Sequence, residues 1–214
     1  MSKSNPLLFN SAMALAVLSG AKTQTRRPQS LDKLRIKMRH HVGQELFGGY
    51  LPARAGSTYA ATLNRNLAVC ANTGHKPLGI KPGEFDFVCP YASGATSLVN
   101  GKWVVESVGD SIWGRETFSQ PETVTYYKCD EEDLLPPGAK WTPSIHMPRY
   151  LSRIVKRVSC VRLEWLRNIT QKDAIAEGIP RESKHPVDEF KELWTGIYGD
   201  KWPWETTLVW VILW

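Results

Sequence analysis

The strongest constraint on the fold is an uninterrupted apolar run near the end of the sequence, Leu208-Val209-Trp210-Val211-Ile212-Leu213-Trp214. A strand with one face in water would alternate apolar and polar residues, and this run does not. It is also far shorter than the roughly 20 residues that cross a membrane as a helix. The run therefore predicts a strand that is buried on both faces, and we expect it to close the fold from within the core.

Local signals predict further strands and three short helices. Asn100-Gly101 between two apolar runs is a strong hairpin signal, because both residues accept positive φ. Strands are also expected at 85–88, 111–118 and 152–166, the last with a bulge at Lys156-Arg157 where its alternation breaks. The helices are expected over residues 12–18, 171–177 and about 186–197, and the second begins with a capping-box-like Thr170-x-x-Asp173.

The chain of 214 residues is long enough to bury a core, and its 42% hydrophobic and 22% charged residues are typical of a globular protein. We predict a single α+β domain over residues 1–214. The stretch from about 43 to 105 is rich in small and polar residues at its start, and we interpret it as an insertion of loops and a hairpin.

Net charge and cysteine spacing indicate which kinds of binding partner, metal site and disulfide to expect. The net charge of +6 favours anionic partners such as nucleotides, RNA or DNA, without demonstrating them. The four cysteines are widely spaced and the histidines form no ligand motif, so we predict neither a metal site nor a disulfide framework, and no cofactor is implied. With no apparent signal peptide or membrane segment, a cytoplasmic location without membrane contact is expected.

The first helix leads into an unusual basic stretch, Gly20-Ala21-Lys22-Thr23-Gln24-Thr25-Arg26-Arg27. Gly20 is suited to end the helix, because glycine adopts the left-handed conformation readily. If the stretch is extended, Lys22, Gln24 and Arg26 share one side, and Thr23, Thr25 and Arg27 share the other. A solvated basic loop is the ordinary interpretation of such a sequence. Pro28, which follows it, is expected to block further regular strand pairing.

A helix followed by Gly-x-Lys-Thr-x-Thr-x-Arg resembles the entry motif of ASCH-domain proteins, which have a PUA-like β-barrel. The family includes small bacterial amidohydrolases that remove the acyl group from N4-acetylcytidine, and larger proteins often found in phages and prophages. The resemblance implies a mixed β-barrel of about six strands with peripheral short helices. The small enzymes have no counterpart of about 80 residues between Arg27 and Gly109.

Two later segments are similar to the larger ASCH proteins. The first is Gly109-Asp110 followed by a strand that ends in Arg115-Glu116-Thr117, with Gly114 marking a bulge or close approach. The second is Trp141-Thr142-Pro143-Ser144-Ile145-His146-Met147-Pro148. From these segments and the entry motif we assign substrate binding to Arg27, Trp113, Arg115, Glu116 and His146, while an internal ion pair for the strand charges and a structural role for His146 stay open.

The resemblance to the small amidohydrolases also implies catalytic residues. Their entry motif supplies a Lys and a Thr, here Lys22 and Thr25. Their Leu-Thr-x-Lys-x-Ala-x-x-Glu segment is similar to residues 169–177, which makes Glu177 the third member. One arrangement has Thr25 as nucleophile with Lys22 as its base; the other has Glu177 activating water while Thr25 and Lys22 bind the oxyanion. An ordinary ion pair between Lys22 and Glu177 is the non-catalytic alternative.

The sequence therefore predicts an amidohydrolase acting on N4-acylated cytosine nucleosides or nucleotides. An RNA- or DNA-binding ASCH module without catalysis is the second hypothesis. A phage accessory protein that binds a host protein is the third. Salt dependence distinguishes the second from the first, because binding through several phosphates weakens steeply with salt.

Overall fold

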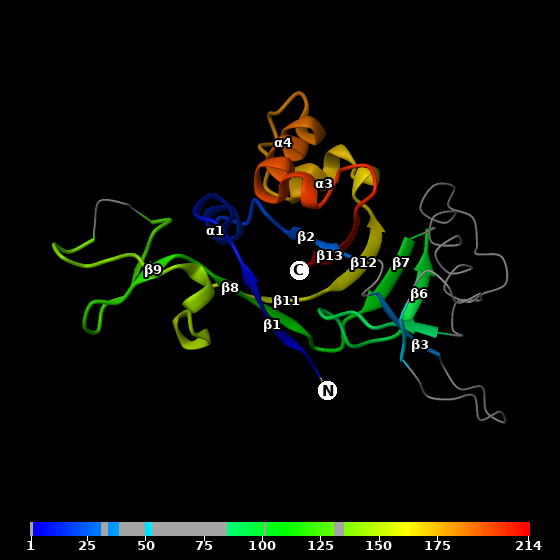
Figure 1. The fold of residues 1–214 in the computed structure, drawn as a ribbon, viewed down its shortest axis with the longest axis horizontal. Helices are drawn as coiled ribbons and strands as arrows, with labels where there is room; N and C mark the ends of the chain where they lie inside the picture. The colour runs from blue at the N-terminus through cyan, green and yellow to red at the C-terminus, as the bar shows by residue number, and fades with distance from the viewer. Residues whose placement is uncertain (1, 31–33, 39–49, 53–84, 101, 131–134) are drawn as a thin grey trace.

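The computed structural model of the chain describes residues 2–30, 34–38, 50–52, 85–100, 102–130 and 135–214 (Figure 1). The fold is mixed α and β, with several sheets and few helices, as the sequence predicts. Most of the predicted insertion lies outside the described residues. In the described part of the chain, no helix is long and apolar enough to cross a membrane.

The largest sheet has five antiparallel strands in the order β2-β13-β12-β7-β6. Their bounds are β2 Gln24–Gln29, β13 Leu208–Leu213, β12 Cys160–Trp165, β7 Lys102–Glu106 and β6 Thr96–Val99. The pairing of β6 with β7 confirms the predicted hairpin, and Asn100 has the expected positive φ of 49°. Strand β2, which carries the basic stretch, lies at one edge of this sheet.

Strand β13 confirms the interpretation of the apolar run. Val209 and Val211 pack on one face of the sheet, beneath the C-terminal helices. Leu208, Trp210 and Ile212 pack into the larger core on the other face. With β2 and β12 as its neighbours, the strand is covered on every side.

A second sheet has the order β1-β8-β11, in which β1 (Ser4–Leu8) and β8 (Ser111–Arg115) are parallel and β11 (Val155–Arg157) is antiparallel. Gly114 of β8 lies against Ile154, and a Cβ at residue 114 would lie 2.8 Å from the Cβ of Ile154. The predicted close approach at Gly114 is therefore confirmed. The remaining sheets are β4-β3-β5, formed by Tyr50–Pro52, Arg35–Met38 and Phe85–Phe87, and β10-β9, formed by Tyr126–Tyr127 and Phe118–Ser119.

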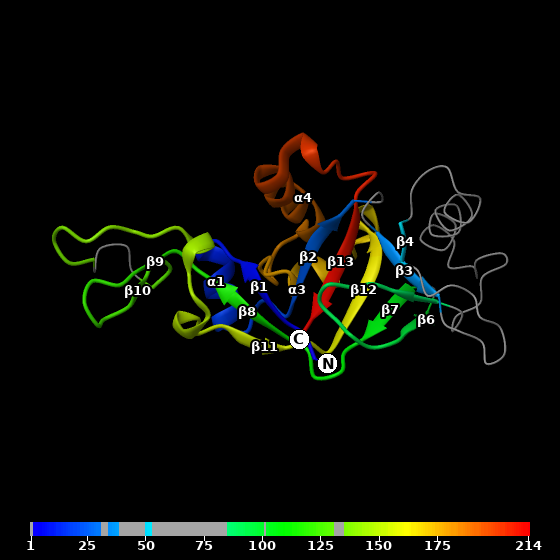
Figure 2. The ribbon, with the colours of Figure 1, turned by 60° about the horizontal axis from the view of Figure 1, so that its bottom comes forward.

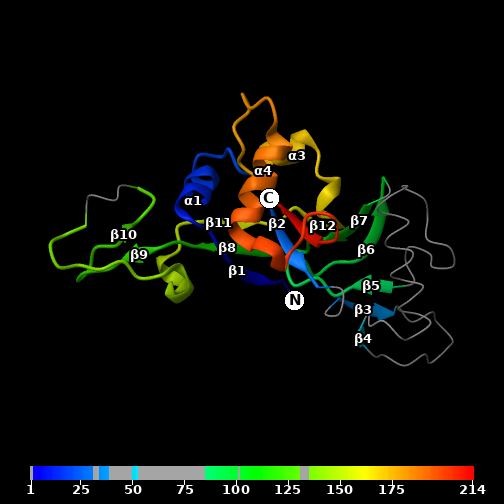
Figure 3. The same cartoon turned by 45° about the horizontal axis from the view of Figure 1, so that its top comes forward.

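The three predicted helices are all present among the described residues. Helix α1 (Ser11–Leu18) is capped by Asn10, whose side chain accepts a hydrogen bond from the Met13 amide, and Gly20 follows it with φ +80°. Helix α3 (Gln171–Ala176) begins with a complete capping box, and helix α4 (Pro186–Tyr198) carries one apolar face. Figures 1 and 3 show α3 and α4 covering one face of the five-stranded sheet.

Between β8 and β11 the chain leaves the body of the molecule. Figures 1 and 2 show the β9–β10 region extending away from the sheets. Two 3-10 helices, η3 (Ser144–His146) and η4 (Arg149–Leu151), bring the chain back to β11. A small core of Phe118, Met147 and Leu151, with Tyr127 packed against it, holds this region together.

Three details differ from prediction. The described strands form separate sheets and do not close into a barrel. The predicted strand over 152–166 is two strands in different sheets, divided at Val158-Ser159, because the Val158 amide donates to Asp110 and the Ser159 amide to Leu213. Pro28 does not end the pairing of β2; it lies opposite Val209, where an edge strand tolerates the missing amide proton.

Candidate functional site

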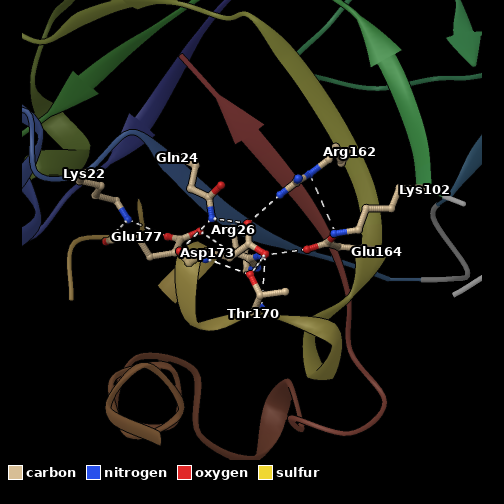
Figure 4. Close-up of polar contacts among 9 residues, drawn as sticks. All are labelled: Lys22, Gln24, Arg26, Lys102, Arg162, Glu164, Thr170, Asp173 and Glu177. Atoms are coloured by element: carbon tan, nitrogen blue, oxygen red, sulfur yellow. Dashed lines mark hydrogen bonds and ion pairs between the residues drawn. The ribbon is translucent and has the colours of Figure 1, made fainter. Parts of the chain in front are cut away.

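A buried ion pair joins the basic stretch to the end of helix α3. Lys22 Nζ donates to Glu177 Oε2 at 2.7 Å and to the backbone oxygen of Glu177 at 2.6 Å (Figure 4). Both side chains are almost fully buried. Helix α3 ends here because Gly178 follows with φ +103°, and the Thr23 amide, which donates to the carbonyl of Ala176, fixes the strand to the helix end.

Arg26 forms the second contact with Glu177. Its Nη1 lies 3.0 Å from Glu177 Oε1, and its Nη2 lies 2.8 Å from Glu164 Oε1 on β12. Each oxygen of the Glu177 carboxylate is therefore held by a different cation. This arrangement fixes the orientation of the carboxylate and pairs each of its oxygens with a cation.

The same network continues along α3 and β12. Gln24 Nε2 donates to the backbone oxygen of Asp173 at 3.0 Å, and Arg162 Nη2 lies 3.0 Å from Asp173 Oδ1. The partly exposed Lys102 also pairs with Glu164, and its Nζ lies 3.1 Å from Glu164 Oε2. Figure 4 shows these side chains as one connected group between the sheet and α3. We call the nine residues drawn there the buried charge network; they are Lys22, Gln24, Arg26, Lys102, Arg162, Glu164, Thr170, Asp173 and Glu177.

The pKa values of Lys22 and Asp173 in this network are both shifted downwards, for different reasons. Removal from water lowers the pKa of Lys22 below 10.5; Glu177 opposes that shift, while the charges of Arg27 and Arg26 add to it. Burial alone would raise the pKa of Asp173, but the hydrogen bond from Thr170 and the charges of Arg26 and Arg162 hold it well below its ordinary value. Asp173 is therefore a permanent anion in this network at neutral pH.

A cavity of about 430 Å³ lies at the edge of the sheet, bounded by β1, β2, α3 and α4. Its volume is in the range typical of sites for small organic molecules. Because β2 is an edge strand, residues from both of its faces reach the cavity. The lining side chains are those of Leu8, Phe9, Asn10, Met13, Thr25, Arg26, Arg27, Thr117, Ser144, Glu177, Phe190, Leu193, Trp194, Ile197 and Tyr198.

Two of the three predicted catalytic residues line this cavity, and the third lies behind one of them. Thr25 and Glu177, which are far apart in the sequence, both line it. Lys22 does not line it, and reaches the site only through its contacts with Glu177. Arg27 lines the cavity, donates to the Leu8 carbonyl at 2.8 Å and stacks near the Phe9 ring.

The other four predicted substrate-binding residues do not line the cavity. Trp113 is buried, and the Arg115 guanidinium lies 4.8 Å from its ring centre while donating to the Ile145 carbonyl. His146 is exposed on η3. Their neighbours Thr117 and Ser144 reach the cavity instead.

Glu116 belongs to a separate ion cluster in the β9–β10 region. Both of its carboxylate oxygens accept from Arg153, at 3.2 and 3.0 Å, and the Cys129 thiol lies 2.9 Å from Oε2. Arg153 also pairs with Asp130 at 2.6 Å. This is the internal ion pair that the sequence left open as an alternative.

Sequence reasoning did not identify five members of the buried charge network as charge partners, namely Arg26, Lys102, Arg162, Glu164 and Asp173. Asp173 was predicted only as a helix cap, a role that it also performs. The available signal was the presence of Arg162 and Glu164 on alternate positions of an otherwise apolar strand, since such charges need partners when buried.

Among the described residues, no group of three or more His, Cys, Asp and Glu side chains is arranged to hold a metal ion. Comparisons of the chain with protein-family models, with curated proteins and with solved structures gave no match.

Proposed function

We propose that this protein is a PUA-like ASCH protein that hydrolyses the amide of N4-acylated cytosine nucleosides or nucleotides. The observation that carries the proposal is the meeting of Thr25 and Glu177 at one cavity, with Lys22 fixed directly behind Glu177. These are the three residue types that the resemblance implies. The aromatic lining of the cavity is suited to a flat heterocycle.

Glu177 is the proposed general base. Its carboxylate removes a proton from a water molecule while the water oxygen bonds to the amide carbon. The bond between that carbon and N4 then breaks, and Glu177 returns the proton to N4. The products are the free cytosine amino group and a carboxylic acid, which loses its proton to solvent.

Thr25 and the arginines are the proposed stabilisers of the negative oxygen. Thr25 lines the cavity, and the Nε atoms of Arg26 and Arg27 are buried without a hydrogen-bond partner among the described residues. Donors of this kind are effective because they are already oriented in a site that excludes water. This assignment favours water as the nucleophile over Thr25.

Lys22 is the proposed positioning residue for Glu177. Its ammonium binds both the side chain and the backbone oxygen of the same residue, so it fixes the carboxylate and the helix end together. Lys22 does not line the cavity, so it is not placed to contact a substrate directly.

The test is hydrolysis of N4-acetylcytidine, followed by absorbance. We expect turnover by the wild type and a loss of at least about 100-fold in kcat for Glu177→Gln and for Thr25→Val, which keeps the side-chain shape. Tyr150→Ala is the matched control, because Tyr150 is 80% exposed and outside the cavity. Thermal unfolding of each variant separates lost chemistry from lost folding.

Wild-type protein that is inert on acetyl and larger acyl cytidines would contradict the proposal. A titration with single-stranded RNA and DNA at several salt concentrations would then test the nucleic-acid-binding hypothesis, for which steep salt dependence is expected. Capture of a host protein that persists in Thr25→Val and Glu177→Gln would instead favour the accessory-protein hypothesis.

A further inference from the structure

One wall of the cavity comes entirely from helix α4. Phe190, Leu193, Trp194, Ile197 and Tyr198 all line it. Their spacing of three or four residues places them on a single helix face. This wall, which we call the α4 wall, presents hydrocarbon and aromatic surface. Thr25 and Glu177 line the same cavity from β2 and from the end of α3.

The α4 wall is rigid at one end and open at the other. Phe190 and Trp194 are buried, and Trp194 Nε1 donates to the Trp202 carbonyl at 2.9 Å. The Trp194 and Tyr198 rings lie 4.3 Å apart. Ile197 is 45% exposed, so apolar surface at the open end is left uncovered until a ligand packs on it.

Apart from the Tyr198 hydroxyl, the polar side-chain groups of the cavity lie on elements other than α4. Asn10 precedes α1, Thr117 follows β8 and Ser144 begins η3, and each contributes a group that can bind a sugar hydroxyl. Thr25, Arg26, Arg27 and Glu177 surround the position proposed for the reacting amide. The α4 wall is thus left for the part of the substrate that has no polar groups.

We propose that the α4 wall binds the acyl group of the substrate and gives the enzyme a preference for large apolar acyl groups over acetyl. The inference rests on the proposed function and adds the substrate class to it. A polyol such as ribose would lose hydrogen bonds to water against this surface, whereas an alkyl or aryl chain gains free energy by leaving water.

The experiment compares kcat/KM for N4-acetyl-, N4-butanoyl-, N4-hexanoyl- and N4-benzoylcytidine. We expect kcat/KM of the wild type to rise roughly fourfold for each methylene that contacts the wall, and benzoyl to exceed acetyl. A series that is flat, or that favours acetyl, would overturn the proposal.

Variants on the wall assign the preference to α4. Ile197→Trp fills the open end, so we expect hexanoyl and benzoyl substrates to lose roughly tenfold or more in kcat/KM while acetyl changes little. Tyr198→Ala removes wall surface, and the gain per methylene is expected to shrink. Equal effects on acetyl and hexanoyl substrates in both variants would contradict the proposal, and Tyr150→Ala serves as the control outside the cavity.

If the wild type hydrolyses none of the substrates, a binding measurement still tests whether the α4 wall is an acyl site. Calorimetric titration of unreacted N4-benzoylcytidine, N4-acetylcytidine and cytidine into the wild type then measures binding alone. Tighter binding of the benzoyl compound, lost in Ile197→Trp, supports the α4 wall as an acyl site even though the hydrolysis proposal has failed. Equal binding of the three compounds, or no binding of any of them, overturns the proposed acyl site as well.

Discussion

Lys22 and Glu177 are separated by 155 residues in sequence, yet the Lys22 ammonium binds two oxygens of Glu177 within 2.7 Å. The Lys22 side chain is fully buried, so water does not replace Glu177 as its partner. The pair therefore serves both stability and the proposed chemistry, and the two effects are separable by measurement.

Removal of one member of this pair is expected to be more damaging than removal of both. Lys22→Met leaves the Glu177 carboxylate with Arg26 alone, and the loss of stability is expected to be about 3–5 kcal/mol. Urea unfolding of Lys22→Met, Glu177→Gln and the double variant gives the coupling energy. If the two single effects add without coupling, the ion pair does not contribute as described.

Lys22 is expected to affect activity by positioning the Glu177 carboxylate, without contacting the substrate. We expect Lys22→Met, where it remains folded, to lower kcat roughly 100-fold because the Glu177 carboxylate is no longer fixed. KM is expected to change little, since Lys22 does not line the cavity. A variant with a raised KM and an unchanged kcat would place Lys22 in contact with the substrate instead.

The lowered pKa of Asp173 predicts that the free energy of unfolding falls at acid pH. Its pKa is held below the ordinary 3.8, so its stabilising contribution is fully present above about pH 4 and is lost as the pH falls further towards its folded-state pKa. Denaturation measured between pH 5 and pH 2.5 should show a smaller acid loss in Asp173→Asn than in the wild type. Asp200→Asn is the control, because Asp200 is an exposed carboxylate, and its acid loss should match the wild type.

Two glycines give opposite predictions for the same substitution. In Gly114→Ala the new methyl would lie 2.8 Å from Ile154 Cβ, and the expected loss is about 1–3 kcal/mol. Gly196, within α4, has open space where its Cβ would lie, so Gly196→Ala is expected to stabilise by about 0.5–1 kcal/mol through helix propensity. Thermal unfolding of both variants checks the packing of β8 against β11 and the helical state of α4.

Cys129 is expected to resist alkylation in the folded protein. Burial, with Glu116 beside it, raises the pKa of the thiol to about 12, so little thiolate forms at pH 8. Iodoacetamide labelling followed by mass spectrometry should modify Cys129 at least about tenfold faster in urea than in buffer. Comparable rates would show that the Glu116–Arg153 cluster opens readily.

Sequence reasoning located most of the local structure, because the signals for it are local. The alternation of Lys22, Gln24 and Arg26 predicted their shared face, and all three contact α3 or its end. The Thr170–Asp173 spacing predicted the capping box. Each of these inferences needs only residues within a few positions of one another.

The arrangement of the sheets could not be predicted in this way. Val158 and Ser159 divide a continuous strand-like sequence because Asp110 and Leu213 accept their amides, and both partners lie about 50 residues away. Glu164 likewise gains its role from Arg26, which lies two strands away in the sheet, and from Lys102 on the neighbouring strand β7. Long-range pairing of this kind leaves no pattern in the neighbouring residues.

The contacts of Lys22 and Gln24 with Glu177 and Asp173 have a geometric consequence. Four residues of helix advance about 6 Å, and two residues of strand advance about 6.6 Å, so the two spacings nearly coincide. Inserting or deleting one residue in either segment would misalign both contacts at once. The length of α3 is thus expected to tolerate no change, whereas single substitutions on its outer surface should be accepted freely.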